Sequence, residues 1–167
     1  MNLKILVTGA TGYVGGLLAP HLAAAGCSVR CLTRDRARLQ GRRWLSQVEV
    51  AEGDALDYGS LRGALDGVST AYYLIHGMQG GEVNAEREAL AARNFCRACE
   101  DAGVERIIYL GELADPNGDL SPYLRSRHQT GEILRSEDIA DAIVHSLAAP
   151  PHVSINEVLV RPTKQRT

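Results

Sequence analysis

The chain has 167 residues, of which 45% are hydrophobic and 23% charged. This length allows one domain with a hydrophobic core and excludes a cofactor domain joined to a separate substrate domain, while the composition excludes disorder as the main state. The formal net charge of -2 gives no overall field that would hold nucleic acid or an anionic membrane. We therefore expect residues 1–167 to form a single folded domain.

The sequence indicates neither export nor membrane insertion. It has no run of about 20 apolar residues, the length that a membrane-spanning helix needs, and its start lacks the layout of a signal peptide. A cytoplasmic protein is expected. The four cysteines lie in apolar periodic segments, which indicates reduced core thiols: Cys27, Cys31, Cys96 and Cys99. The C-x-x-C pair among them falls within a predicted helix without a second pair or a histidine, so no metal site is predicted.

Short β-rich segments alternate with helical patterns along the chain. In chain order the pattern predicts a strand at 3–8, a helix at 12–25, a strand at 28–33, a short helix within 34–43, a strand at 48–51, a helix at 58–66, a strand at 70–75, a helix at 82–102, a strand at 106–110, a helix at 122–149 and a strand at 154–160. Repeated strand-helix-strand crossovers require a parallel sheet, because parallel neighbours need a long right-handed return connection. The predicted class is therefore α/β: a doubly wound, six-stranded parallel sheet with helices on both faces.

A glycine series follows the first predicted strand and opens the first helix: Thr8-Gly9-Ala10-Thr11-Gly12-Tyr13-Val14-Gly15. Gly9 permits a tight turn, Gly12 lets the backbone approach a diphosphate, and Gly15 lets helix and strand pack closely. The start of the helix also supplies free N–H groups and a partial positive charge. The alternative is an ordinary glycine-rich turn, but the flanking strand and helix favour dinucleotide binding. The candidate cofactor-binding residues of this loop are Gly9, Thr11, Gly12, Tyr13, Val14 and Gly15.

The end of the second predicted strand bears on which dinucleotide is bound. A carboxylate there accepts hydrogen bonds from the ribose 2′-hydroxyl, whereas an arginine receives a 2′-phosphate. Arg34 can make a bidentate contact with a phosphate, and Arg38 follows one turn later. NADP(H) is therefore preferred. In the alternative, Arg34 is an ordinary surface residue, Asp35 takes the ribose, and NAD(H) is the cofactor.

Three further residues are cofactor-binding candidates because they follow predicted strands at the carboxyl edge of the sheet. Asp54 and Ala55 come just after the third strand, where the adenine should lie, although Asp54 is nearly as well explained as a turn residue. His76 follows the fourth strand near the expected nicotinamide, a position where most histidines are simple loop residues.

Four segments together resemble the NmrA-like, atypical branch of the short-chain dehydrogenase/reductase superfamily: Thr8 to Gly15, Gly53-Asp54, Gly103 to Gly111 and Leu120 to His128. The resemblance runs from residue 1 to about Arg135 and implies a Rossmann fold. Segments 136–141, 151–156 and 160–163 resemble instead the final helix and strand of ordinary short-chain dehydrogenases. The strand and substrate-covering segment that members place between these parts are absent, which indicates either a natural shortened relative or an engineered join near Arg135-Ser136.

The resemblance also implies a catalytic set of Ser, Tyr and, four residues beyond the Tyr, Lys. Tyr123 stands at the Tyr position, where it would be the acid/base, but Arg127 stands where the Lys is expected. Gly111-Glu112 replaces the expected Ser. Only Lys4 and Lys164 are lysines, and neither falls near this pattern. Tyr123 and Arg127 are therefore the catalytic candidates, with a packing tyrosine at a helix start as the alternative for Tyr123.

Three functions follow from these observations. The first is an oxidoreductase that transfers hydride between NADPH and a small carbonyl or quinone-like substrate. The second is a non-catalytic module that binds or senses the dinucleotide, and the third is an engineered scaffold without activity. The C-terminal helix and edge strand resemble elements that pair subunits, so a homo-oligomer is a further hypothesis.

Overall fold

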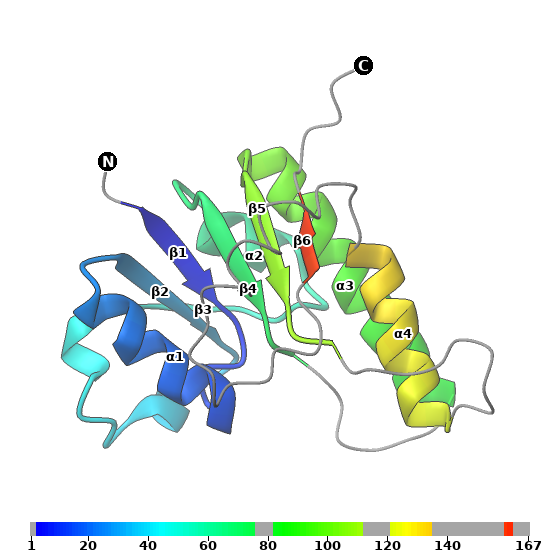
Figure 1. Cartoon of the computed structure of the whole chain (residues 1–167), viewed down its shortest axis with the longest axis horizontal. Helices are drawn as coiled ribbons and strands as arrows, with labels where there is room; N and C mark the ends of the chain where they lie inside the picture. Colours follow the sequence, from blue (N-terminus) through cyan, green and yellow to red (C-terminus); the bar gives the residue numbers. More distant parts are fainter. Residues whose placement is uncertain (1–2, 76–81, 112–120, 135–158, 162–167) are drawn as a thin grey trace, which may run out of the picture.

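The computed structural model describes residues 3–75, 82–111, 121–134 and 159–161, which form a twisted sheet with helices on both faces (Figure 1). Its strands are β1 (Lys4–Val7), β2 (Ser28–Thr33), β3 (Glu49–Glu52), β4 (Thr70–Tyr73), β5 (Arg106–Tyr109) and β6 (Leu159–Arg161). Its α-helices are α1 (Tyr13–Ala24), α2 (Tyr58–Ala64), α3 (Glu82–Ala102) and α4 (Pro122–Leu134), and its 3-10 helices are η1 (Arg36–Leu39) and η2 (Leu45–Gln47). The strand order is β3-β2-β1-β4-β5-β6.

The prediction of six parallel strands is wrong for the last strand. Strands β1 to β5 are parallel, with Ile5 in register with both Val29 and Thr70. β6 pairs with β5 in the antiparallel direction, Tyr109 opposite Leu159. Side-chain pattern indicates that a segment is a strand but not its direction, which depends on the end from which the chain enters the sheet. Of the helix predicted over 122–149, residues 135–149 lie outside the described part.

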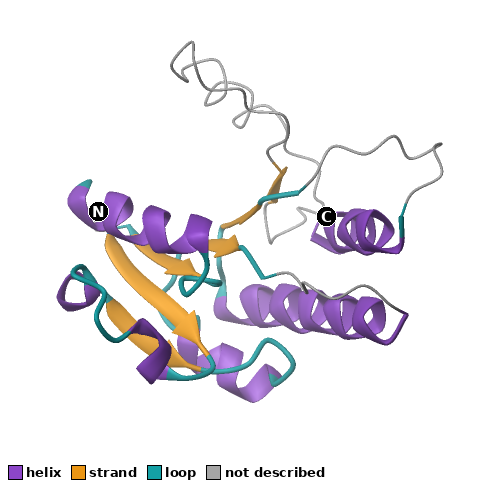
Figure 2. Ribbon diagram, turned by 90° about the horizontal axis from the view of Figure 1, so that it is seen from below, coloured by secondary structure: helices purple, strands orange, loops and turns teal. Residues whose placement is uncertain are grey.

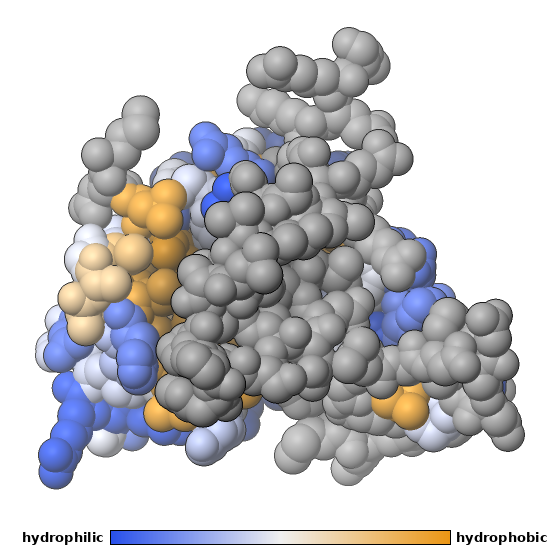
Figure 3. Space-filling model, viewed as in Figure 1, coloured by the Kyte–Doolittle hydropathy of each residue, from blue (hydrophilic) through white to orange (hydrophobic). Residues whose placement is uncertain are grey.

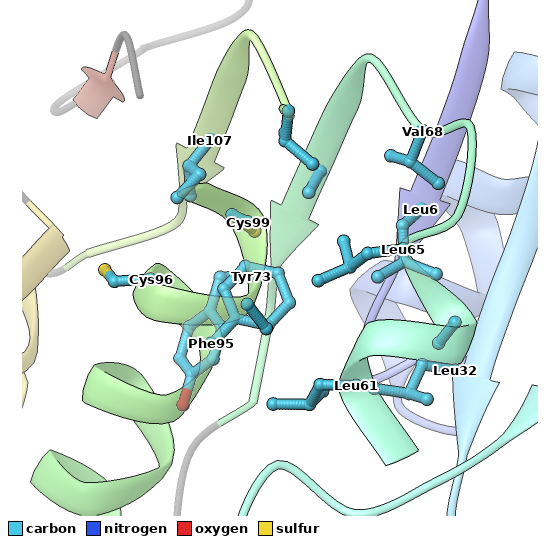
Figure 4. Packing of buried hydrophobic residues seen from close by; sticks show 14 of the residues in the cluster. Leu6, Leu32, Leu61, Leu65, Val68, Tyr73, Phe95, Cys96, Cys99 and Ile107 are labelled. Carbon is cyan, nitrogen blue, oxygen red and sulfur yellow. The ribbon is translucent and has the colours of Figure 1, made fainter. Parts of the chain in front are cut away.

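Alternating strand residues create two separate cores, one on each face of the sheet. Figure 2 shows the helices that cover the two faces. Leu6 of β1 faces α2 and α3, whereas Ile5 and Val7 face α1, as expected for a period of two. In the larger core the ring of Tyr73 lies 4.9 Å from that of Phe95 (Figure 4). Because each face has its own core, the sheet is packed from both sides, and the loops at the carboxyl edge leave this packed sheet.

The helix boundaries follow from local capping. Asp57, expected from sequence as the cap of the helix at 58–66, accepts a hydrogen bond from the backbone N–H of Gly59 (2.9 Å) at the start of α2. The longest helix, α3, occupies the predicted residues 82–102. The Asp57 cap and the bounds of α3 are thus confirmed, whereas α2 ends at Ala64, two residues before the predicted end.

The cysteines are free thiols, and all except Cys27 are buried. Burial raises the pKa of Cys31 to about 12 and also raises the pKa of Cys99. Cys96 and Cys99 lie in the core between α3 and the sheet (Figure 4). Within the described ranges, no three His, Cys, Asp or Glu side chains are grouped to hold a metal ion, and no helix is long and apolar enough to cross a membrane.

Candidate dinucleotide-binding site

The glycine loop begins at Thr8, which ties the carboxyl end of β1 to that of β4. The Thr8 side chain is fully buried. Its hydroxyl donates to the carbonyl oxygen of Tyr72 (3.0 Å) and accepts from the N–H of Leu74 (2.9 Å), and its own N–H donates to the same Tyr72 oxygen (3.0 Å). Three hydrogen bonds from one residue fix the point at which the loop leaves the sheet.

Gly9 and Gly15 are required by the packing of the loop itself. Gly9 has φ +67°, and a Cβ there would lie 2.8 Å from the carbonyl oxygen of Leu74. A Cβ on Gly15 would lie only 2.4 Å from the carbonyl oxygen of Gly9, closer than any real contact. The first turn of α1 therefore sits directly against the loop that precedes it.

Gly12 is less tightly packed than the other two glycines. It is the N-cap of α1 with an ordinary extended conformation (φ -80°, ψ 179°), and of the described atoms its added Cβ would meet within 4 Å only the carbonyl oxygen of Gly9, at 3.3 Å. The missing side chain thus leaves open space beside the helix start. That space is where a diphosphate would approach the backbone, so the loop fits a dinucleotide.

The start of α1 is open to solvent in the described structure. Tyr13 is 85% exposed and Val14 44% exposed. Among the described side chains, none accepts a hydrogen bond from the backbone N–H of Thr11, Tyr13 or Val14. The first helical amides have no partner within a helix, so, as far as the described residues show, these donors can bind an anion. Figure 3, seen from the same side as Figure 1, shows apolar surface over β1 and α1.

The turn after β2 presents basic side chains and uses its carboxylate internally. Arg34 and Arg38 are exposed. The carboxylate of Asp35 accepts from the N–H of Ala37 (2.8 Å) and caps η1, while the hydroxyl of Thr33 donates to the Asp35 carbonyl oxygen (2.9 Å). Asp35 is thus engaged in local structure, whereas the two arginine side chains extend into solvent.

Arg42 reaches the glycine loop, a contact that sequence reasoning missed. Its Nη2 donates to the carbonyl oxygen of Thr11 (3.2 Å). Its Nη1 lies 3.3 Å from where a Cβ on Gly16 would be, so the guanidinium rests against the first turn of α1. Arg42 and Thr11 are 31 positions apart in the sequence. The only sequence signal for such a contact is the high number of arginines in residues 34–43.

Asp54 and Ala55 follow β3 in a tight turn. One carboxylate oxygen of Asp54 accepts from the N–H of Leu56 (3.0 Å), and the Asp54 N–H donates to the hydroxyl of Ser60 (3.0 Å). Ala55 is buried. These contacts are those of a turn residue, the alternative that the sequence left open for Asp54. The third candidate of this group, His76, lies outside the described residues.

Arg127 points toward the end of β5. Its Nη2 donates to the carbonyl oxygen of Leu110 (2.7 Å), and its guanidinium carbon lies 5.5 Å from the centre of the Tyr109 ring. The Tyr109 hydroxyl in turn donates to the Arg127 carbonyl oxygen (3.2 Å). Arg127 is 7% exposed, and its Nε has no hydrogen-bond partner among the residues that the structure describes. The side chain of Tyr123, in the first turn of α4, lies outside the described part, as does Glu112.

The five parallel strands β1 to β5, with the glycine loop at the carboxyl edge of β1, define a Rossmann domain of the kind that binds nicotinamide dinucleotides. The chain belongs to the NAD(P)H-binding family, whose model matches residues 9–150. This membership confirms the predicted relation to the NAD(P)-binding short-chain dehydrogenases/reductases, and a nicotinamide dinucleotide is the cofactor of the domain.

Three of the proteins that this chain resembles are named as reductases. The (4-alkanoyl-5-oxo-2,5-dihydrofuran-3-yl)methyl phosphate reductase of Streptomyces griseus is 36% identical over 128 residues, which cover 77% of this chain and 41% of that enzyme. Dihydroflavonol 4-reductase of Hordeum vulgare is 27% identical over 131 residues, covering 71% of this chain and 37% of the relative. The Citrobacter triphenylmethane reductase, solved in complex with NADP(H), superposes with a TM-score of 0.63 at 28% identity, covering 77% of this chain and 44% of that structure. The chain thus spans less than half the length of these proteins.

Proposed function

We propose that this protein binds NADP(H) and transfers hydride between the nicotinamide and a small carbonyl or quinone-like substrate. The observation that carries the proposal is the start of α1, where no described side chain caps the helix and Gly12 leaves space beside its first turn. The named reductases among the relatives, and the NADP(H) complex of the Citrobacter enzyme, support the same reading.

The preference for NADP(H) is argued from the turn after β2. The Asp35 carboxylate already accepts a hydrogen bond from Ala37 as the cap of η1, which makes it a poorer acceptor for a ribose hydroxyl. The exposed Arg34 and Arg38 are suited to an extra phosphate, because guanidinium groups bind phosphate with charge-assisted hydrogen bonds.

The chain's own residues divide the work as follows. The amides of the glycine loop would hold the diphosphate, and a bound nicotinamide would supply or accept the hydride. Tyr123, on α4, is the proposed proton donor to the substrate carbonyl oxygen. Arg127 is tied to Leu110 and Tyr109, so it holds α4 against the end of β5. Arg127 stands where short-chain dehydrogenases have a lysine, and this difference changes the chemistry because a guanidinium does not replace a compact ammonium.

Titration with NADPH, followed by the fluorescence of Trp44, tests the cofactor assignment. Trp44 is the only tryptophan in the chain and packs beside the smaller core, close to the segment that follows β2. We expect NADPH to bind more tightly than NADH and Arg34→Ala to reduce that preference. Tighter binding of NADH would contradict the cofactor assignment, and an unchanged preference in Arg34→Ala would exclude Arg34, but not NADP(H), from it.

A second candidate function is a non-catalytic sensor of the dinucleotide. It is favoured by the position of Lys4, the one lysine among the described residues, which lies far from where a catalytic lysine would be needed. Lys4 lies at the amino end of β1, the opposite edge from the glycine loop, and pairs with Glu49 (3.4 Å). Turnover of NADPH with generic carbonyl and quinone acceptors distinguishes the two functions. Robust NADPH oxidation that is lost in Tyr123→Phe supports the enzyme, whereas binding without turnover supports the sensor.

A homo-oligomer and a cytoplasmic location remain part of the proposal. β6 is the edge strand of the described sheet, and an edge strand can pair with a second copy. Light scattering at working concentration tests this, and a monomeric mass would contradict it.

A further inference from the structure

We propose that Arg42 binds the 2′-phosphate of NADP and is the main residue that selects NADP over NAD. The inference rests on the proposed function, since it concerns the same cofactor site. It assigns the selecting contact to a residue in the segment after η1, rather than to the arginines at the end of β2 that the sequence favoured.

The backbone on both sides of Arg42 is fixed. Leu39, at the end of η1, is fully buried in the smaller core, and the Arg42 N–H donates to the Leu39 carbonyl oxygen (3.2 Å) across a turn at Gly41 (φ +79°). On the other side, the Leu45 N–H donates to the Arg42 carbonyl oxygen (3.1 Å). The side chain therefore starts from a held position, and its contact with Thr11 follows from the fold of the segment.

The sheet order tells from which side Arg42 approaches the loop. β2 lies next to β1 on the side away from β4, and Arg42 belongs to the segment that follows β2. In a dinucleotide site the adenosine ribose lies at the end of β2, while the diphosphate lies over the first turn of the helix. A guanidinium that touches Thr11 from the β2 side is thus placed beside the ribose.

The charge of Arg42 also indicates an anion. Its guanidinium rests against the first turn of α1, the positive end of the helix dipole, where a cation is unfavourable. No carboxylate of the described residues forms an ion pair with it, and its hydrogen bond to Thr11 occupies one donor of the five that a guanidinium has. A phosphate bound by the remaining donors of the guanidinium, on its β2 side, would offset this repulsion.

Arg42 is better prepared for binding than the other candidates. Within the described residues, the side chains of Arg34 and Arg38 form no hydrogen bond or ion pair, so both must be ordered when a phosphate binds. The guanidinium of Arg42 is already held beside the loop by Thr11. A side chain that is positioned before binding loses less conformational freedom, and its contact contributes more to affinity.

Isothermal titration calorimetry with NADP and NAD tests the inference on four proteins: wild type, Arg42→Gln, Arg42→Ala and Arg43→Gln. Glutamine removes the charge but keeps an N–H donor for the Thr11 carbonyl oxygen. Arg43 is the matched control, since it is exposed and adjacent in sequence. We expect Arg42→Gln to weaken NADP binding by about 10-fold to 100-fold, the range of a lost charge-assisted phosphate contact, while NAD binding and both affinities of Arg43→Gln change less than about 3-fold.

Each other result overturns the inference in an identifiable way. If Arg42→Ala weakened NADP and NAD equally while Arg42→Gln bound both normally, Arg42 would be a brace for the loop. If Arg42→Gln left NADP binding intact while Arg34→Ala removed it, the phosphate would lie at the end of β2. If wild type bound neither nucleotide, the proposed function would fail together with this inference.

Discussion

The three glycines of the loop can be separated by experiment because an added Cβ meets a milder contact at Gly12 than at Gly9 or Gly15. Gly12→Ala is expected to lower the free energy of unfolding by less than about 1 kcal/mol, since its Cβ meets one carbonyl oxygen at 3.3 Å. The same methyl group occupies the space beside the helix start, so dinucleotide affinity should fall at least about tenfold. Urea denaturation and NADPH titration measure the two quantities.

Two matched variants complete the glycine test. Gly15→Ala should be destabilised by about 3 kcal/mol or more, because its Cβ would lie 2.4 Å from the Gly9 carbonyl oxygen. Gly63→Ala, on the exposed face of α2 with nothing within 4 Å, should gain up to about 1 kcal/mol and keep its affinity. Normal binding by Gly12→Ala would show that the cofactor does not use this space.

Burial predicts that the four thiols differ in reactivity. Cys27 is the one cysteine with partial exposure, whereas Cys31, Cys96 and Cys99 are buried. The thiolate is the reactive form, and burial keeps Cys31 protonated by raising its pKa to about 12. We expect one thiol to react rapidly with a disulfide reagent in native buffer and four in urea. Rapid native reaction that persists in Cys27→Ser would contradict the described core.

At the scale of the elements, Arg30 joins β2 to the end of α2. Its Nη1 donates to the carbonyl oxygens of Ala64 (2.7 Å) and Asp66 (3.0 Å), and its Nε donates to Glu49 of β3 (2.9 Å). Arg30→Ala should lower the free energy of unfolding by about 2 kcal/mol, because helix-end carbonyl groups lose their donor. Glu49→Gln should change it by less than about 1 kcal/mol, since that carboxylate is half exposed. Denaturation curves of the two variants provide the comparison.

The contact between Arg30 and Glu49 also predicts how the stability of the fold depends on pH. The hydrogen bond from Arg30, followed by the one from Lys4, lowers the pKa of Glu49 below its ordinary value. A depressed pKa in the folded state means that the stabilisation is complete above the pKa of the unfolded chain and is lost as pH falls through the folded value. A carboxyl-detected NMR titration should give a Glu49 pKa below the ordinary value of 4.5 in wild type and a pKa closer to that value in Arg30→Ala. An identical titration in both proteins would mean that the ion pair does not form in solution.

Strand and helix positions could be predicted from sequence because each depends on local periodicity and caps. Asp57 and the helix at 82–102 are examples. The direction of β6 and the contact of Arg42 with Thr11 could not, since both depend on where distant segments meet. Arg127 illustrates the same limit: its spacing from Tyr123 resembled a catalytic pattern, but a guanidinium can also stack on Tyr109 and bind a carbonyl oxygen, and no sequence pattern chooses between these partners.

For the molecule as a whole, the packing of Gly9 against Leu74 connects two halves of the carboxyl edge. The backbone oxygen of Leu74 leaves no room for a side chain on Gly9, and the Leu74 N–H is bound by the Thr8 hydroxyl. A nucleotide that immobilised the loop after β1 would therefore also immobilise the chain leaving β4. Hydrogen-deuterium exchange tests this coupling between the two loops. The amide of Leu74 should exchange more slowly when NADPH is present, although Leu74 follows β4 and the residues proposed to bind the phosphates follow β1.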